Sequence, residues 1–468
     1  MDYFLEMENG NLSNRERRRE KVHPERLFLL IAVIAGLAFA LVQPLFIEPD
    51  ASYHFDKSTY ISNSVVDRAK IGFPAEDYQS LPVPFTTVSG MLKDGTYYKN
   101  FFKKKLAKIS KDKVADKRAI GSVWYKDIMH VVPAIGVSLG HAIYPSVGVM
   151  VITARLLSLL FFIISMYFII KKLKAYRMVF VVISISPVAI QMAASLSYDC
   201  FNYVACAWLI ATLINWAIDI KSNLNLTLLN FISRFFLPII AVYVSKSNSR
   251  LLYLLVILSF IVFIVKKLDV KVEKIQAYVA TAIFFVAGAS FYIFKYHDQL
   301  RVVINKFIYT FMEPYYSVLT TQVISGTSTV AVPAWFFPIQ YAALVLLLLS
   351  YTKERVPRWF AWTGLVLNLL NVFGVLFRFA INPNFAEHVI TGPQGRYFTV
   401  FLLLLAPIFT LLAQKITVLS SNNWLKRMVI LISVLALVLN LGITVLKFYH
   451  LQVPMDEFRS GIEHYIFK

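Results

Sequence analysis

The residues best suited to chemistry surround Asp50. This aspartate follows an apolar stretch, and His54 lies four residues further on, so the two side chains would share one face of a helix. Glu48 and Asp56 lie close by in the sequence. A carboxylate at a membrane surface can accept a proton from a hydroxyl group, or help to bind a divalent cation such as Mg²⁺ or Mn²⁺. An aspartate that caps a helix, beside an interfacial histidine, fits the same spacing.

A second group of residues leads into an apolar stretch near the end of the chain: Gly392-Pro393-Gln394-Gly395-Arg396-Tyr397. Two glycines and a proline predict a tight turn, which would hold the Arg396 guanidinium at the membrane boundary. Arginine keeps its charge and matches phosphate oxygens with a fork of donors. An arginine that anchors a helix end among lipid headgroups explains the same position.

Other charged residues fall near the same expected side of the bilayer: Arg155, Asp199 and Arg378. A charge at mid-bilayer costs about 2.5–3.5 kcal/mol on insertion scales, so such residues usually have a task. Together with Asp50 and Arg396, they suit an anionic headgroup such as a lipid phosphate. Part of this clustering is expected for any charged residue, because charges avoid the bilayer centre.

The elements that must position these residues are membrane helices. The chain is 58% hydrophobic and 16% charged, whereas a soluble domain is about 45–50% apolar and about 25% charged. The excess forms blocks of about 17–22 residues, the length that crosses a hydrocarbon core of about 30 Å. We therefore predict an all-α polytopic membrane protein with about eleven transmembrane helices: 27–47, 149–170, 178–196, 201–220, 229–245, 250–265, 276–295, 334–350, 359–380, 397–413 and 427–447.

The basic residues predict the orientation of these helices. The formal net charge is +20, which in a soluble protein would suggest nucleic acid as a partner. Most Lys and Arg lie in short turns between apolar blocks, so topology and anionic lipid explain them, and we expect no nucleic-acid partner. The positive-inside rule then places the N-terminus in the cytoplasm, with the lipid bilayer as the first partner of the chain.

These considerations divide the chain into a cytoplasmic basic tail (1–26), a first transmembrane helix (27–47), an extracytoplasmic loop domain (48–128), a re-entrant or interfacial segment (129–148), a transmembrane helical bundle (149–447) and an extracytoplasmic tail (448–468). Long loops without structure are uncommon and tend to be functional. In the first loop we expect a helix over 51–69, with Asp50 as its N-cap. A Lys-rich helix over 100–118 would place Phe102, Leu106 and Ile109 against the membrane surface, or would be a solvated basic face. Proline and glycine over 129–147 disfavour a regular spanning helix.

Three stretches resemble one bacterial membrane-protein family, the domain of unknown function 2142 group. They are Pro49-Asp50-x-x-x-His54-Phe55, then Ser186-Pro187 with Ser195-x-Ser197-Tyr198-Asp199, and Gly392-x-Gln394-Gly395-Arg396-Tyr397-Phe398. That family is in turn similar to integral-membrane glycosyltransferases of the GT-C type. Such enzymes have many spans and an acidic residue in the first outer loop, and they take a sugar from a polyprenyl-phosphate carrier.

The resemblance implies roles for two of these residues. It makes Asp50 the catalytic base or a metal carboxylate, and it directs Arg396 to the donor phosphate. The chain departs from the family pattern at Ala51, where a glutamate usually follows the aspartate. If that acid is a metal ligand, Glu48 or Asp56 must replace it, or the enzyme is metal-independent, or activity is lost.

Our leading hypothesis is a glycosyltransferase that moves a sugar from a polyprenyl-phosphate donor to a cell-surface glycan acceptor at the outer leaflet. Asp50 is its catalytic residue, and the expected substrate-binding residues are His54, Arg155, Asp199, Arg378, Gln394, Arg396 and Tyr397. Two alternatives use the same chain differently. One is a transporter or flippase for a lipid-linked polysaccharide intermediate. The other is a non-catalytic membrane protein of envelope assembly.

Overall fold

The computed structural model describes residues 23–71, 85–120, 127–222, 224, 226–268, 297–313, 316–353, 355–382, 388–414 and 423–451. Within these residues every regular element is a helix. Two isolated bridges, Val66 with Lys108 and Gly326 with Ala331, tie extended segments together. The expectation of an all-helical protein is therefore confirmed for the described chain.

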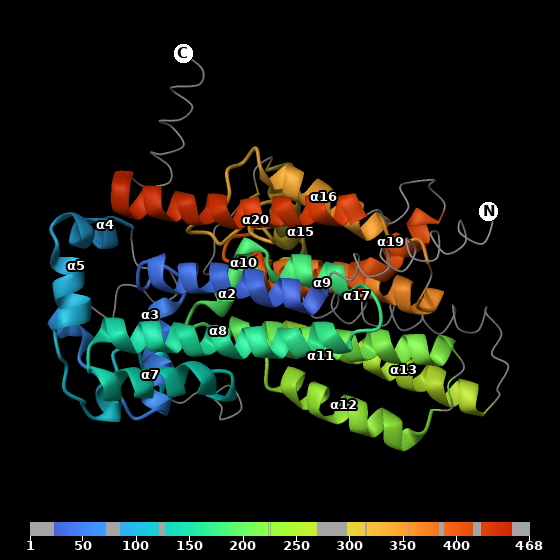
Figure 1. The fold of residues 1–468 in the computed structure, drawn as a ribbon, viewed down its shortest axis with the longest axis horizontal. Coiled ribbons are helices and arrows are strands. Elements are labelled where there is room, and N and C mark those ends of the chain that lie inside the picture. The colour runs from blue at the N-terminus through green and yellow to red at the C-terminus, as the bar shows by residue number, and fades with distance from the viewer. Residues whose placement is uncertain are drawn as a thin grey trace, which may run out of the picture.

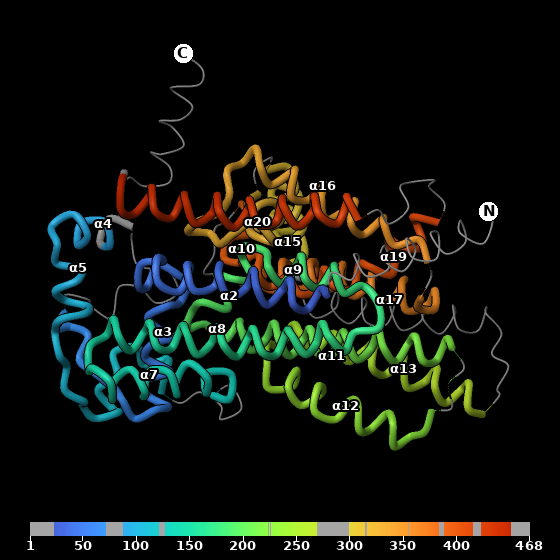
Figure 2. The backbone as a smooth tube through the Cα atoms, in the orientation of Figure 1, coloured from blue at the N-terminus to red at the C-terminus, as the bar shows by residue number. Residues whose placement is uncertain are grey.

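The longest helices run alongside one another and form the body of the molecule (Figure 1). Figure 2 shows α2 (Pro24–Val42) between α8 (Val147–Lys172) and α20 (Asn423–Val445), and α2 contacts both. Seven described segments are long and apolar enough to cross a membrane: Pro24–Val42, Val147–Lys172, Asp199–Lys221, Ser247–Lys267, Arg358–Ala380, Arg396–Ala413 and Asn423–His450. Each coincides with one of the eleven predicted spans, which makes this a multi-pass membrane protein.

The remaining predicted spans differ from that pattern. The stretch 178–196 is two short helices, α9 (Arg177–Ser184) and α10 (Pro187–Ala193). Pro187 cannot donate the backbone hydrogen bond that would continue α9, and it suits the first position of a new helix. The prediction of one continuous span is therefore corrected.

Two further predicted spans are short apolar helices, and one cannot be compared. They are α12 (Leu228–Tyr243) and α16 (Phe337–Leu349). At about 1.5 Å per residue, the 13 residues of α16 cover about 20 Å, less than a hydrocarbon core of about 30 Å. The predicted span 276–295 lies outside the described residues.

The first loop folds at one end of the bundle, where Figure 1 shows α3 (Ala51–Ile61), α4 (Phe85–Lys93) and α5 (Thr96–Tyr98). The expected helix over 51–69 is present as α3 but ends at Ile61. A short 3₁₀ turn, Arg68–Ile71, follows further on.

The predicted surface helix over 100–118 is wrong. The stretch is divided into short turns, which are a π-helical turn at Lys99–Lys103 and 3₁₀ turns at Lys111–Lys113 and Lys117–Ala119. Between them the backbone bonds to distant segments: Leu106 donates to the Pro145 carbonyl at 2.8 Å, and Ile109 to the Val65 carbonyl at 2.9 Å. Leu106 is buried in the core of the loop rather than in lipid. Spacing alone therefore mistook an extended, packed segment for an amphipathic helix.

The segment 129–147 contains a regular helix, α7 (Val131–Ile143), which is too short to be among the seven spanning segments. It packs closely on α8 through two glycines. A Cβ atom on Gly136 would lie 2.4 Å from Ala154 Cα, and one on Gly140 would lie 2.6 Å from Met150 Cα. Glycines that we expected to disfavour a helix instead allow two backbones to approach each other.

A buried amide network holds the second long loop, the described residues 316–336 that precede α16, against the bundle. Asn440 of α20 donates to the carbonyls of Ser325 at 3.2 Å and Val330 at 3.3 Å. Gln191 of α10 donates to the Asn440 side-chain oxygen at 2.8 Å. Each of these amide and carbonyl groups would be costly to bury without a hydrogen bond, so the network favours this position of the loop.

Candidate functional site

Four charged residues from separate parts of the chain meet at the end of the bundle's helices. We call Asp50, Asp199, Lys246 and Arg396 the charged cluster. Arg396 Nη2 lies 3.9 Å from Asp50 Oδ2, and Arg396 Nε lies 2.9 Å from Asp199 Oδ2. Lys246 forms an ion pair with the other Asp199 oxygen. The structure thus brings together three residues that the sequence analysis named and one that it did not.

Asp50 is held by the backbone in an unusual way. It precedes α3 with a φ of 59° and a ψ of 17°, a left-handed conformation that aspartate tolerates better than most residues. Asp50 occupies the expected N-cap position of α3, but its carboxylate makes no capping hydrogen bond to the helix. The side chain faces Arg396 instead and remains 26% exposed. Burial raises the pKa of the Asp50 carboxyl, and Arg396 opposes that shift.

Asp199 is the buried anchor of the cluster. It is the first residue of α11 (Asp199–Lys221), where the helix dipole favours a negative charge. The Ser197 hydroxyl donates to Asp199 Oδ2 at 2.8 Å and accepts from the Asp199 backbone amide at 3.1 Å. With two cations and a hydroxyl around it, this carboxylate fixes where Arg396 and Lys246 lie.

Lys246 is the member of the cluster that the sequence analysis missed. It lies between α12 and α13 (Leu252–Lys267), and its ammonium stands 4.1 Å from the centre of the Tyr397 ring and 5.0 Å from that of Tyr198. Burial lowers the pKa of Lys246 to about 8, although Asp199 opposes the shift. One signal could have found it: a lysine in a short outer linker runs against the positive-inside pattern.

Beneath the cluster lies a buried histidine pair. His54 Nδ1 is 3.0 Å from His130 Nε2, and the Tyr198 ring packs on both imidazoles. Burial and the neighbouring His130 hold the pKa of His54 well below its usual value, so its imidazole is neutral at pH 7. His54 is 1% exposed and supports the cluster from below rather than facing it from outside.

The first loop adds an arginine above Asp50. The Arg118 guanidinium lies 5.1 Å from the centre of the Tyr53 ring and is held by Asp116 at 2.5 Å. Its charge lowers the pKa of Asp50. The loop therefore contributes an exposed cation close enough to Asp50 to act on its carboxyl group.

Arg155 does not belong to the cluster, contrary to our expectation. It is fully buried, and its guanidinium donates to the carbonyls of Gln43 at 2.6 Å and Pro44 at 3.0 Å. It also pairs with Glu48 at 2.7 Å. Arg155 thus holds the chain where it leaves α2, and its donors serve this structural task.

The proposed metal carboxylates are not assembled either. Glu48 pairs with Arg155, while Asp56 pairs with Arg68 at 2.7 Å and accepts from the Asp116 amide at 2.7 Å. Asp50 faces Arg396. Among the described residues, none forms a group of three or more His, Cys, Asp or Glu side chains suited to a metal ion. The residues around Asp50 therefore do not fit a divalent cation.

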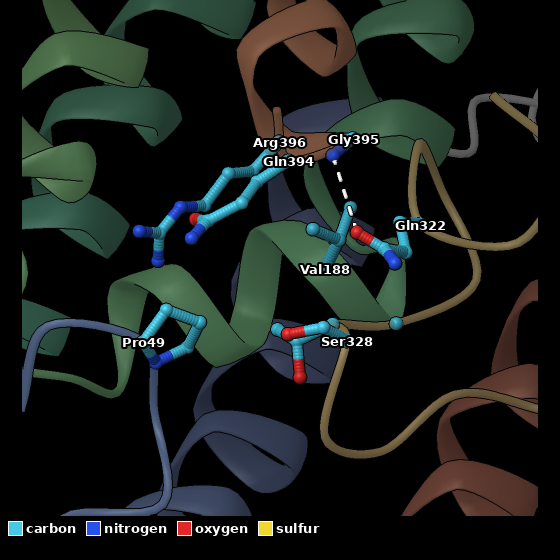
Figure 3. A pocket seen from close by; sticks show the side chains of 9 residues that line it. Pro49, Val188, Gln322, Ser328, Gln394, Gly395 and Arg396 are labelled. Atoms are coloured by element: carbon cyan, nitrogen blue, oxygen red, sulfur yellow. Dashed lines mark hydrogen bonds between the residues drawn. The ribbon is translucent and has the colours of Figure 1, made fainter. Parts of the chain in front are cut away.

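Of the other predicted substrate-binding residues, one lies outside the charged cluster and two lie beside it. Arg378, on α17 (Arg358–Ala380), is exposed and lies outside the charged cluster. The Tyr397 ring stacks against Lys246, and the Tyr397 carbonyl accepts from Asn371 at 3.1 Å. Gln394 lines a small hollow beside Arg396 (Figure 3). The turn predicted from glycine and proline therefore delivers Gln394, Arg396 and Tyr397 to the site.

Comparison with known protein families identifies the family of this chain. A family model described as a predicted membrane protein, domain of unknown function 2142, matches residues 33–405. Comparison with curated proteins finds no match, and comparison with solved structures finds none either. The family match spans most of the chain and includes all four residues of the charged cluster. The chain therefore belongs to the domain of unknown function 2142 family of membrane proteins.

Proposed function

We propose that this protein is a glycosyltransferase of the GT-C type, which moves a sugar from a polyprenyl-phosphate donor to a cell-surface glycan acceptor at the outer leaflet. The observation that carries the proposal is the meeting of Asp50 with Arg396, 3.9 Å apart, beside Asp199 and Lys246. A carboxylate of raised pKa next to two fixed cations combines a proton acceptor with a phosphate-binding group.

The place of the cluster in the membrane supports a lipid-linked substrate. Asp199 and Arg396 are each the first residue of a membrane-spanning segment, and Asp50 follows α2 closely. The cluster therefore lies at the membrane boundary, where a lipid phosphate lies. In this proposal the N-terminus is cytoplasmic, 48–128 is the extracytoplasmic domain, and the membrane is a bacterial plasma membrane.

The reaction is a single displacement with inversion. The acceptor hydroxyl oxygen attacks the anomeric carbon, and its proton passes to the Asp50 carboxylate. The bond between the anomeric carbon and the phosphate oxygen breaks, and the polyprenyl phosphate leaves with the electron pair. Arg396 and Lys246 stabilise the charge that develops on that oxygen. Lys246 replaces Arg155 and Arg378 in the role that we had expected for a second cation.

Asp50 and Arg396 keep hydrogen-bonding capacity for this task. A separation of 3.9 Å is beyond a hydrogen bond, so the contact between the two side chains is electrostatic. The fixed carboxylate of Asp199 holds Arg396 in place without engaging Asp50. In this proposal the enzyme acts without a metal, because Glu48 and Asp56 are each committed to an arginine.

The test is release of polyprenyl phosphate by the purified protein in the presence of acceptor. Asp50→Asn should reduce release by at least about 10²-fold, the contribution typical of a general base. Asp94→Asn is a matched control, because Asp94 is an exposed aspartate of the same loop. Full release by Asp50→Asn, with the protein folded, would remove Asp50 from the mechanism.

A transporter of a lipid-linked intermediate is the second candidate, and the break between α9 and α10 favours it. Transporters place binding groups at interrupted membrane helices, and this break lies beside the buried Gln191. A transporter would move intact donor across a liposome bilayer without releasing polyprenyl phosphate. An assembly scaffold would do neither, and its Asp50 and Arg396 variants would be silent.

A further inference from the structure

A small hollow with both polar and apolar walls adjoins the charged cluster at Arg396, and its volume of about 10 Å³ leaves room for about one hydroxyl group or water molecule. Its walls are Val188 of α10, the second-loop residues Gln322 and 326–328, the turn 394–396, and Pro49. Figure 3 shows the Gln394 and Arg396 side chains running side by side, with Pro49 and Ser328 facing them. Because Pro49 directly precedes Asp50, the hollow lies next to both halves of the proposed site.

Gln394 carries an unused acceptor in this wall. Its side-chain oxygen is buried and accepts no hydrogen bond from any described residue. Buried acceptors in folded proteins nearly always have a donor, and an exception calls for an explanation. A ligand that brings a hydroxyl or amide hydrogen into the hollow would supply that donor.

The other lining groups define the ligand's chemistry. Gln322, Thr327 and Ser328 bear amide and hydroxyl groups, which donate and accept without charge. Among the described residues of the lining Arg396 is the one that carries a charge, so these residues offer no carboxylate to a cation. Val188 and Pro49 add apolar edges. Uncharged donors and acceptors beside apolar edges suit a group that carries both hydroxyls and C–H faces.

We infer that this hollow receives one hydroxyl group of the donor's sugar, with Gln394 as a residue that selects among sugars. The inference rests on the proposed function, because it places the sugar next to a phosphate held by Arg396. The sugar's hydroxyl donates to the Gln394 oxygen, while the phosphate lies on the guanidinium of the neighbouring Arg396. The turn 394–396 thus contacts both the sugar and the phosphate of the donor.

The wall of the hollow formed by the second loop is already held in place before a ligand binds. A Cβ atom on Gly395 would lie 2.2 Å from the Gln322 carbonyl carbon, so the second loop lies directly on this turn. The Gly395 amide donates to Gln322 Oε1 at 3.5 Å, the dashed line of Figure 3. The Thr399 hydroxyl donates to the Val323 carbonyl at 2.6 Å. A wall that is already ordered costs little entropy when a ligand binds.

The test compares phosphate with sugar phosphates on the full-length protein in detergent. Calorimetry would measure Kd for inorganic phosphate and for glucose, galactose and mannose 1-phosphates. We expect one sugar phosphate to bind roughly tenfold more tightly than phosphate, the value of one or two neutral hydrogen bonds. Gln394→Ala should abolish that preference and leave the Kd for phosphate within about twofold. Gln414→Ala, which alters an exposed glutamine, is the control.

The outcomes separate this inference from the proposed function. Equal Kd values for phosphate and all three sugar phosphates, with phosphate binding intact, would overturn the inference alone. A preference that survives Gln394→Ala would also overturn it. Phosphate binding that is absent, or unaffected by Arg396→Ala, would overturn the proposed function and this inference with it.

Discussion

Arg396 bridges two aspartates that lie far apart in the sequence, with its Nε 2.9 Å from Asp199 and its Nη2 3.9 Å from Asp50. The closer contact is with the buried acid, and the longer one is with the acid that remains 26% exposed. Asp199 therefore positions the guanidinium, while Asp50 stays available to a substrate. This unequal sharing is what the proposed function requires: one acid that positions the guanidinium and another that can meet a substrate.

Arg396→Ala should lower stability as well as remove anion binding. The change leaves Asp199 buried with Lys246 as its remaining cation, and breaking a buried ion pair typically costs about 3–5 kcal/mol. Thermal unfolding in detergent measures the effect. Adding Asp199→Asn to Arg396→Ala should not recover the loss, because it takes the remaining carboxylate partner from the buried Lys246 ammonium, and anion binding stays absent. Normal stability of Arg396→Ala alone would show that Asp199 is satisfied in another way.

Phosphate affinity should fall as the pH rises through about 8. The pKa of Lys246 is lowered to about 8, so its ammonium is charged below that pH and neutral above it. A neutral amine attracts an anion less. Lys246→Arg keeps its charge at every accessible pH and should hold affinity constant to about pH 10. The measurement is Kd for phosphate against pH, and an identical alkaline fall in both proteins would exclude Lys246 as its cause.

The rate of sugar transfer should fall at acid pH, and the fall should begin at a higher pH than the usual pKa of an aspartate would give. The pKa of Asp50 is raised from 3.8 by burial, and only the ionised carboxylate accepts a proton. The rate kcat/KM should therefore decline as the pH falls through a pKa higher than 3.8. The control is Asp94→Asn, which should leave this limb unchanged. A rate that stays flat down to pH 4 would rule out Asp50 as the base.

A residue's position can be predicted from the sequence where local features determine it, and not where contacts with distant parts of the chain do. The positions of Asp50, Asp199 and Arg396 follow from apolar blocks and short turns, which are local features. The residues that these three side chains contact do not follow from such local features. Arg155 has the same residue type and boundary position as Arg396, yet its guanidinium is used by the carbonyls at the end of α2. Residue type and depth predict where a charge lies, and tertiary contacts decide what it binds.

The same limit explains the errors in the fold. The seven long apolar helices are predictable because bilayer thickness imposes their length. The segment 100–118 has helical spacing, but Leu106 and Ile109 at its centre donate to distant carbonyls, and a local pattern cannot predict such partners. Lys246 falls in the linker between α12 and α13, where a lysine runs against the predicted positive-inside pattern, but no local feature shows that Asp199 and the Tyr397 ring are its partners.

Arg155→Ala should destabilise the protein without a direct effect on the charged cluster. The variant leaves Glu48 buried with its cation removed, and breaking such a pair costs about 3–5 kcal/mol. Arg155→Met with Glu48→Gln removes both charges and should recover much of that loss. Arg378→Ala is the matched control, because that exposed arginine should change stability by less than about 0.5 kcal/mol. A stable Arg155→Ala would contradict its structural role.

The glycine contact between α7 and α8 should be as sensitive as a core position. A Cβ atom on Gly136 would meet the Ala154 backbone at 2.4 Å, and backbone cannot give way as a side chain can. Gly136→Leu should therefore push α7 from α8 and lower the unfolding temperature. Gly374→Leu is the control, because nothing lies within 4 Å of a Cβ atom there. Because α7 also packs on α3, which follows Asp50, the first variant should weaken phosphate binding too. Equal stability of both variants would show that the helices do not depend on this close approach.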